Sequence, residues 1–160
     1  WRPYYLYRSL GRGITMKAVV QRVLSAVLTV DGNEISRIGR GFVVYFGVAK
    51  GDDDEKCDYV VKKIAALRAF EDENGKTNLS LSDVGGSVLF VSQFTLLADL
   101  KKGNRPSFTE AEEPQKAKEK YLYSAQKLIG QGVDVKLGVF GADMKITQVN
   151  DGPFTLVYEI

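Results

Sequence analysis

The chain has 160 residues, of which 22 are Lys or Arg and 20 are Asp or Glu, with one Cys and no His. Without His there is no Ser-His-Asp triad, no Cys-His pair and no His-ligated zinc site. The lone Cys57 closes no internal disulfide and forms no CxxC motif, which favours a reducing compartment and excludes a dithiol redox centre. Because 44% of the residues are apolar and 26% are charged, we expect one globular domain. We expect it to hold no metal and no cofactor.

The net charge of +2 is distributed unevenly along the sequence. Residues 1–15 hold Arg2, Arg8 and Arg12 and no acid, and setting these three aside leaves 19 basic against 20 acidic side chains. A nucleic-acid partner would therefore meet a local basic patch rather than a globally basic surface. The longest apolar run, residues 42–48, is of strand length and too short for a membrane span. We expect a soluble, cytoplasmic protein.

Residues 1–15 (WRPYYLYRSLGRGIT) differ in composition from the residues that follow. They are aromatic and basic, are interrupted by Pro3, Gly11 and Gly13, and show no sustained period. We interpret them as an N-terminal extension to a domain at residues 16–160. The extension could be a tag, an alternative start or a targeting remnant, since it is acid-free but poor in Ser. A targeting remnant would imply an organelle instead of the cytoplasm.

The first half of the domain reads as strands followed by a helix. Apolar pairs between residues 19 and 30 predict a strand, and Asp31-Gly32 predicts a tight hairpin turn into a second strand at residues 35–38. Residues 42–48 predict a strand that is buried on both faces. Asp52, with Glu55 three residues later, predicts the start of a helix. The apolar stripe of this helix is expected at Cys57, Val60, Val61, Ile64 and Leu67, with Cys57 a packed, inert thiol.

The second half predicts further strands around one more helix. Residues 87–94 predict a strand, and a helix is expected at residues 114–129. Its apolar positions are Leu122, Ala125, Leu128 and Ile129. Strands follow at residues 133–139, 144–149 and 154–158, with residues 150–153 as a turn between the last two. The order predicts an α+β fold with a mostly antiparallel, barrel-like mixed sheet and two principal helices.

Three polar segments are candidates for function. Residues 92–96 (Ser-Gln-Phe-Thr-Leu) could be a strand end whose hydroxyl groups satisfy the backbone, and residues 150–153 could be only a turn. Residues 99–107 predict a loop with Lys101, Lys102 and Arg105, which suit either phosphate contacts or a solvated surface. No Walker loop or GxGxxG motif occurs between a strand and a helix, so nucleotide-dependent phosphoryl or hydride transfer lacks its usual support.

Six motifs, in order from Met16 to about Tyr158, resemble the D-aminoacyl-tRNA deacylase (D-tyrosyl-tRNA(Tyr) deacylase) family. They are Met16-Lys-Ala-Val-Val-Gln-Arg22-Val, Phe70-Glu-Asp-Glu-Asn-Gly-Lys, Ser92-Gln-Phe-Thr-Leu96, Arg105-Pro-Ser-Phe108, Gly138-Val-Phe-Gly-Ala-Asp-Met144 and Asn150-Asp-Gly-Pro-Phe-Thr155. Several motifs in register are more specific than any one of them. Residues 1–15 lie outside the resemblance.

The resemblance implies a homodimeric hydrolase that cleaves the ester between a D-amino acid and the terminal adenosine of tRNA, a chiral proofreading step in translation. Ser92, Gln93, Phe94 and Thr95 would line the pocket as catalytic residues. A Gly152-Pro153 dipeptide with a cis bond would enter from the partner subunit, held in place by Arg22, and Met144 would contact the substrate. Lys101, Lys102 and Arg105 are candidates for binding the tRNA.

The implied selector is main chain, which has no rotamers that move aside. A rigid backbone wall would collide with an L-residue, whereas one methylene of pocket contact discriminates by only about 1–3 kcal/mol. Glycine has no side chain to exclude, so glycyl-tRNA, including tRNA(Ala) mischarged with glycine, should also be cleaved.

Two mechanisms fit the residues. Thr95 could act as a nucleophile, although its motif contains no base to activate it. Alternatively, backbone amides near Phe94 and Thr95 stabilise the oxyanion while the 2′-hydroxyl of the adenosine helps activate water, and we favour this RNA-assisted route. The competing function is a non-catalytic nucleic-acid-binding module on the same fold.

Overall fold

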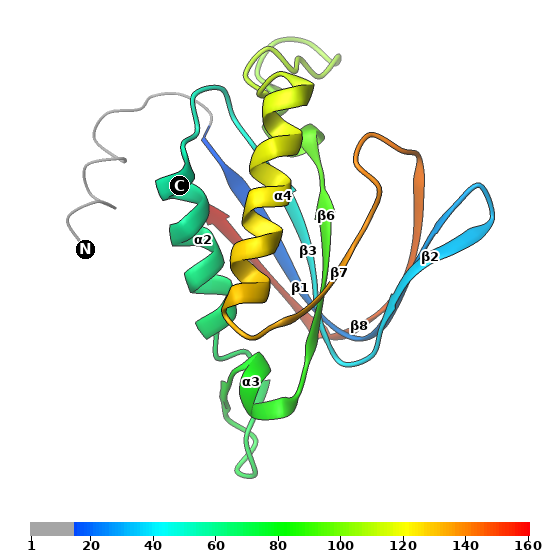
Figure 1. Cartoon of the computed structure of the whole chain (residues 1–160), viewed down its shortest axis with the longest axis vertical. Coiled ribbons are helices and arrows are strands. Elements are labelled where there is room, and N and C mark those ends of the chain that lie inside the picture. The colour runs from blue at the N-terminus through cyan, green and yellow to red at the C-terminus, as the bar shows by residue number, and fades with distance from the viewer. Residues whose placement is uncertain (1–14) are drawn as a thin grey trace.

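Six strands form the main sheet of the protein, which the computed structural model describes for residues 15–160 (Figure 1). The predicted extension at residues 1–15 therefore lies outside the described residues except for Thr15. The elements in chain order are β1 (Lys17–Val30), β2 (Asn33–Ile38), β3 (Gly41–Gly47), α2 (Asp54–Ala66), β4 (Phe70–Glu71), β5 (Thr77–Leu79), α3 (Leu81–Val84), β6 (Ser87–Ser92), the 3₁₀ helix η1 (Phe94–Leu97), α4 (Pro114–Gly130), β7 (Asp134–Leu137) and β8 (Met144–Glu159).

The strand order of the sheet is β2-β1-β3-β6-β7, and β8 pairs with β1. The β1 strand is antiparallel to β2, β3 and β8, whereas β3–β6 and β6–β7 are parallel pairs. Parallel pairs need crossover connections, which contain α2 and α4. The Ser36 hydroxyl of β2 donates to the Leu137 carbonyl at the end of β7 over 2.5 Å. The two ends of the sheet thus approach each other, and the predicted α+β fold with a barrel-like mixed sheet is confirmed.

The predicted hairpin turn joins β1 to β2. Val30 pairs with Asn33, so the loop between them has two residues. Asp31 has a φ of 51° and Gly32 a φ of 79°, as a type I′ turn requires at both of its central positions.

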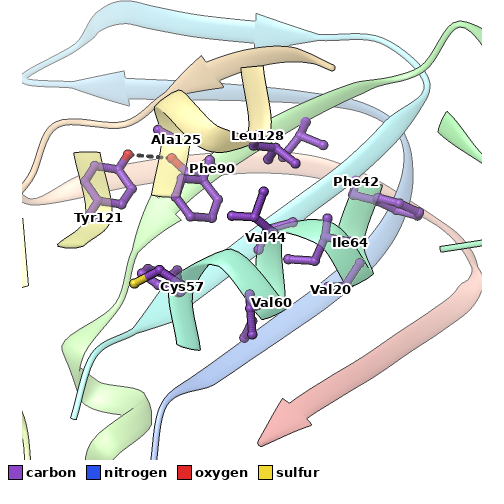
Figure 2. Close-up of a cluster of buried hydrophobic side chains, with 14 of the residues drawn as sticks. Val20, Phe42, Val44, Cys57, Val60, Ile64, Phe90, Tyr121, Ala125 and Leu128 are labelled. Atoms are coloured by element: carbon purple, nitrogen blue, oxygen red, sulfur yellow. Dashed lines mark hydrogen bonds between the residues drawn. The ribbon is translucent and has the colours of Figure 1, made fainter. Parts of the chain in front are cut away.

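Helices α2 and α4 lie side by side on one face of the sheet, where they cover the larger core (Figure 1). Phe90 of β6 stacks on Tyr121 of α4 with ring centroids 5.1 Å apart, and Phe46 packs against Phe90 at 5.2 Å. The Tyr121 hydroxyl donates to the Phe90 carbonyl over 2.6 Å (Figure 2). The Cys57 thiol is fully buried in this core, and burial raises its pKa to about 11. The inert thiol predicted for Cys57 matches this environment.

A second core fills the inside of the curled sheet. It is made of strand residues whose side chains point away from the helices, namely Val23, Ala26, Leu28, Ile38, Val43, Leu89 and Val91. Strand β3 therefore has a core on each side, as predicted from its continuous apolar run.

The start of α2 differs from the prediction by one residue. Asp53, not Asp52, is the N-cap, and its carboxylate accepts from the Lys56 amide. Asp52 instead points inward, where its carboxylate accepts from the Ala49 amide over 2.7 Å and pairs with the Lys56 ammonium over 3.0 Å. Desolvation raises the pKa of the Asp52 carboxyl. Three consecutive Asp residues all suit a cap, and the local bond of the Asp52 carboxylate to the Ala49 amide, three residues earlier, leaves the cap to Asp53.

The buried face of α4 is also displaced from the predicted one. Ala125 and Leu128 are buried as expected, but Leu122 and Ile129 are 41% and 44% exposed. Tyr121 and Ser124 take the inward positions instead. Both polar side chains bond to backbone carbonyls, which offsets the cost of burying their hydroxyl groups.

Two strand boundaries were wrong in the prediction. Strand β6 ends at Ser92 rather than residue 94, because the chain turns into η1. The last two predicted strands are one strand, β8, which runs along β1 (Figure 1). Residues 150–153 are a local departure from that ladder and not a reversal of the chain. Within residues 15–160, no helix is both long and apolar enough to cross a membrane.

We expect the Tyr121 hydroxyl to contribute measurably to the free energy of unfolding. Tyr121→Phe keeps the stacked ring but removes a buried hydrogen bond, so we expect the free energy of unfolding to fall by about 1 kcal/mol. Urea titration with an unchanged slope would measure it. Tyr123→Phe on the same helix is the control, because its hydroxyl bonds to the exposed Asp58. Equal losses in the two variants would contradict the prediction.

Candidate active site

A cavity of about 640 Å³ lies beside the carboxyl end of β6. One wall is the end of β6 and the start of η1, from Val91 to Phe94. The second wall is residues 108–117, which lead into α4, and the third is residues 140–146, which lead into β8. The parallel pairing of β3 with β6 places the end of β6 at this edge, where the chain crosses over to α4.

The chain turns sharply at the end of β6, which brings Gln93 and Phe94 to the cavity, whereas Thr95, one residue further along η1, does not line it. The Gln93 amide donates to the Phe46 carbonyl over 2.8 Å, and the Leu96 amide donates to the Gln93 carbonyl over 3.3 Å. A side chain at Gly47 would put its Cβ 2.5 Å from the Leu97 side chain and 2.9 Å from the Gln93 carbonyl. Glycine at this position therefore lets η1 pack against β3.

The turn presents amides rather than a reactive side chain. Because the first bond of η1 is donated by Leu96, the amides of Phe94 and Thr95 precede it and have no acceptor within the helix. The Thr95 hydroxyl accepts from the Gln93 side-chain amide, which is neutral and cannot remove a proton. Among residues 15–160, no group of His, Cys, Asp or Glu side chains is arranged to hold a metal ion.

Aromatic and apolar side chains form most of the walls. Phe94 is 55% exposed and meets Phe108 edge to face, with ring centroids 5.0 Å apart. Phe140, Met144 and Ile146 lie on the wall beyond them. Phe108 and Phe140 belong to motifs of the family resemblance but were not predicted as site residues. Their motif positions were the signal, since an isolated Phe is more often a core residue.

Met144 reaches the cavity through a close approach of two segments. A Cβ at Gly138 would lie 2.7 Å from the Met144 sulfur and 3.1 Å from the Leu28 side chain. Gly138 therefore leaves the room that Met144 occupies at the start of β8.

The predicted basic loop lies next to the cavity wall but outside it. Asp99 and Ser107 pair across the base of the loop, with amide–carbonyl distances of 2.7 and 3.0 Å in the two directions. Lys101, Lys102 and Arg105 are all exposed on it, and none of the three lines the cavity.

Arg22 and Gly152-Pro153 form a separate site on β1 and β8. Gln21 pairs with Thr155 and Val23 with Asn150, so the four residues Asp151–Phe154 stand opposite the single residue Arg22. We call these four residues the β8 bulge. The Gly152–Pro153 peptide bond is cis, both residues are exposed, and neither lines the cavity of this chain.

The buried Arg22 side chain holds the β8 bulge from the helix side of the sheet. Its Nη1 donates to the Ala69 carbonyl over 2.6 Å and its Nε to the Asp151 carbonyl over 3.1 Å. The guanidinium lies over the Phe154 ring at 4.7 Å from the centroid, and Nε is 3.4 Å from the Asp151 carboxylate. The arginine predicted to hold the Gly-Pro segment is thus in contact with it.

Comparisons with known proteins fit these observations. A sequence model of the family described as D-Tyr-tRNA(Tyr) deacylase matches residues 19–159. A D-aminoacyl-tRNA deacylase of Lactobacillus gasseri is 51% identical over 145 residues, which are 91% of this chain and 100% of that protein. One from Desulfitobacterium hafniense is 49% identical over 144 residues, or 90% of this chain and 97% of that protein.

Two solved structures are similar in fold. The c-Myc DNA Unwinding Element Binding Protein superposes with a TM-score of 0.84 at 41% identity, covering 90% of this chain and 98% of that one. A probable eukaryotic D-amino acid tRNA deacylase has a TM-score of 0.80 and covers 92% of this chain and 100% of that one. Its identity is 20%, so this second likeness shows the fold alone.

Proposed function

The chain belongs to the D-Tyr-tRNA(Tyr) deacylase family and is a D-aminoacyl-tRNA deacylase, a hydrolase, and we propose that its cavity cleaves the ester between a D-amino acid and the terminal adenosine of tRNA while sparing L-aminoacyl esters. The observation that carries this proposal is the pairing of two features. One is the cavity lined by Ser92, Gln93 and Phe94 at the end of β6, and the other is the exposed β8 bulge held by Arg22.

The substrate's handedness is read by the Gly152-Pro153 backbone of a partner subunit. The dipeptide is exposed and absent from the cavity of its own protomer, so it is available to a second copy. Arg22 restrains it through the Asp151 carbonyl, and a restrained backbone excludes an L side chain by collision. A two-fold axis would place each dipeptide in the other subunit's cavity.

The surface around the bulge supports a homodimer. Within residues 15–160, β8 pairs only with β1, which leaves its other edge available. Leu24, Val149 and Val157 are between 50% and 56% exposed on these two strands. Apolar side chains beside an open strand edge are suited to contact a second copy.

Hydrolysis follows the RNA-assisted route. Water attacks the ester carbonyl, the amides of Phe94 and Thr95 stabilise the oxyanion, and the C–O bond breaks to release the D-amino acid and the 3′-hydroxyl of the adenosine. Each such donor contributes about 10²–10³ in rate. The neighbouring 2′-hydroxyl of the substrate helps activate water, and the cavity walls limit access of bulk water. This assignment gives Ser92 and Gln93 positioning roles and Met144 a contact with the substrate.

The catalytic unit is the domain at residues 16–160. Lys101, Lys102 and Arg105 bind the tRNA beside the cavity. The role of the protein is chiral proofreading in translation. The cytoplasmic location expected from the sequence remains a prediction.

A second candidate function is non-catalytic binding of nucleic acid. It is favoured by the similar structure named as a DNA unwinding element binding protein, at 41% identity. The exposed basic loop would supply the phosphate contacts in that case. Catalytic turnover separates the two functions, because a binding module releases no amino acid.

The first prediction about function concerns turnover and handedness. With the protein at catalytic concentration, D-tyrosyl-tRNA and glycyl-tRNA, including glycyl-tRNA(Ala), should release free amino acid, whereas L-tyrosyl-tRNA should stay intact. Release of labelled amino acid over time measures this. Equal hydrolysis of the D and L esters would remove the proposed selector, and hydrolysis of neither would favour the binding module.

A second prediction separates the two mechanisms. If the amides act, Thr95→Ala should retain kcat for D-tyrosyl-tRNA within about tenfold, since it loses only a hydroxyl. Thr109→Ala, which removes a hydroxyl from the cavity lining, is the control. A complete loss of activity in Thr95→Ala, with normal folding and normal binding of a non-hydrolysable analogue, would establish Thr95 as the nucleophile instead.

The basic loop yields a prediction about salt. The double reversal Lys101→Glu/Lys102→Glu, and separately Arg105→Glu, should raise KM and flatten the dependence of log(kcat/KM) on log[salt] by about 0.7 for each lost phosphate contact. The reversal Lys62→Glu/Lys76→Glu, at exposed positions on α2 and beside β5, changes the charge equally. The same salt slope in the loop variants and in this control would rule out phosphate contacts by the loop.

A further inference from the structure

A row of polar side chains crosses the base of the β8 bulge on the face opposite Arg22. The Gln148 Nε2 donates to the Gln21 Oε1 over 2.8 Å and to the Asn150 Oδ1 over 2.6 Å. The Gln21 Nε2 in turn approaches the Thr155 hydroxyl at 3.4 Å. The row therefore consists of Asn150, Gln148, Gln21 and Thr155.

The strand register gives this row its significance. Gln148 and Asn150 precede the bulge on β8, and Thr155 follows it. Gln21 of β1 bonds to both sides, so the side chains join the two ends of a segment whose backbone has left the ladder. We call these four residues, Gln21, Gln148, Asn150 and Thr155, the amide clamp.

Tyr45 orients the clamp from β3. Its hydroxyl donates to the Gln148 Oε1 over 3.0 Å, which directs both Nε2 hydrogens toward Gln21 and Asn150. Tyr45 is half-buried, and desolvation raises the pKa of its hydroxyl, so it stays a donor at neutral pH. Three strands thus meet at the Gln148 side chain.

Neighbouring residues on a strand point to opposite faces, and β1 uses this at the bulge. Arg22 holds the Asp151 carbonyl from the helix side, and Gln21 joins the clamp on the other side. A contact on one face alone would let the backbone of the four-residue bulge rotate about that contact. Contacts on both faces oppose this rotation.

We infer that Gln148, oriented by Tyr45, is a specificity-determining positioning residue. It keeps the Gly152-Pro153 backbone in the position that excludes L-aminoacyl esters. This inference rests on the proposed function, since it assigns the clamp a role in that selection. Gln148 does not line the cavity. It acts through Asn150 and Thr155, the two residues that flank the bulge.

The test measures the ratio of D-tyrosyl-tRNA to L-tyrosyl-tRNA hydrolysis. Gln148→Leu keeps the size of the side chain but removes its donors and acceptor, and Tyr45→Phe removes only the orienting hydroxyl. We expect the D/L ratio to fall about tenfold in Gln148→Leu, the factor that one or two net hydrogen bonds supply. Tyr45→Phe should show a smaller fall, and the double variant should fall no further than Gln148→Leu alone. Such non-additivity marks residues that act as one unit.

Thr147→Val is the matched control, because Thr147 neighbours Gln148 on the opposite face of β8 and is exposed. Its D/L ratio should equal that of the wild type. A purely structural role for the clamp would lower the unfolding temperature without changing the ratio, and that result would overturn the inference. If Gln148→Leu does not fold, an unchanged ratio in Tyr45→Phe overturns it equally. Wild-type protein that cleaves neither ester overturns the proposed function itself, whereas a selective wild type with an unaltered Gln148→Leu overturns this inference alone.

Discussion

A buried guanidinium must find acceptors on all sides, and the Arg22 side chain meets this constraint with main-chain carbonyls rather than with a fully buried carboxylate. It is 8% exposed and bonds to Ala69, which follows α2, and to Asp151, which opens the β8 bulge. Leaving such a charge unpaired in the core is costly. The two segments are consequently held at fixed positions, and the bulge cannot close into a regular ladder without taking an acceptor away from Arg22.

The sheet separates the two halves of the proposed site within one protomer. The parallel crossovers place the end of β6 and its amides at one edge, beside the cavity. The bulge lies on the antiparallel β1–β8 pair, where Arg22 restrains it on one face and the amide clamp on the other. Each half is held by its own hydrogen bonds, and a two-fold assembly would bring the two halves together. The strand edge of β8 and its exposed apolar side chains would form the contact in such an assembly.

The chemistry proposed for the cavity suits its composition. Its walls are mainly aromatic and aliphatic, and the Thr95 hydroxyl faces a neutral amide. Backbone amides do not titrate and have no rotamers, so a site built from them needs few special side chains. The substrate's own 2′-hydroxyl would help activate the attacking water. Selection and catalysis both depend on main-chain positions in this scheme, which explains why glycines at 47 and 138, where a Cβ would collide, matter to the geometry.

Features that depend on neighbouring residues could be predicted from the sequence. Turn chemistry predicted the Asp31-Gly32 hairpin. Hydrophobic periodicity predicted the buried stripe from Cys57 to Ile64 and the doubly buried β3 strand, and the order of these elements predicted the mixed fold class. The motif resemblance further predicted site roles for Ser92–Thr95, Arg22 and Gly152-Pro153, and these roles stay proposals. The choice of Asp53 over Asp52 as the cap of α2 is also local, because Asp52 accepts from the amide of Ala49, three residues earlier.

Tertiary contacts decided other features. Tyr121 takes the inward position that was expected for Leu122, because a carbonyl of β6 accepts its hydroxyl. Whether residues 150–153 reverse the chain or bulge from one strand depends on β1, more than a hundred residues earlier in the sequence. Local preference for a turn is satisfied by either geometry, and only the long-range pairing with β1 distinguishes them.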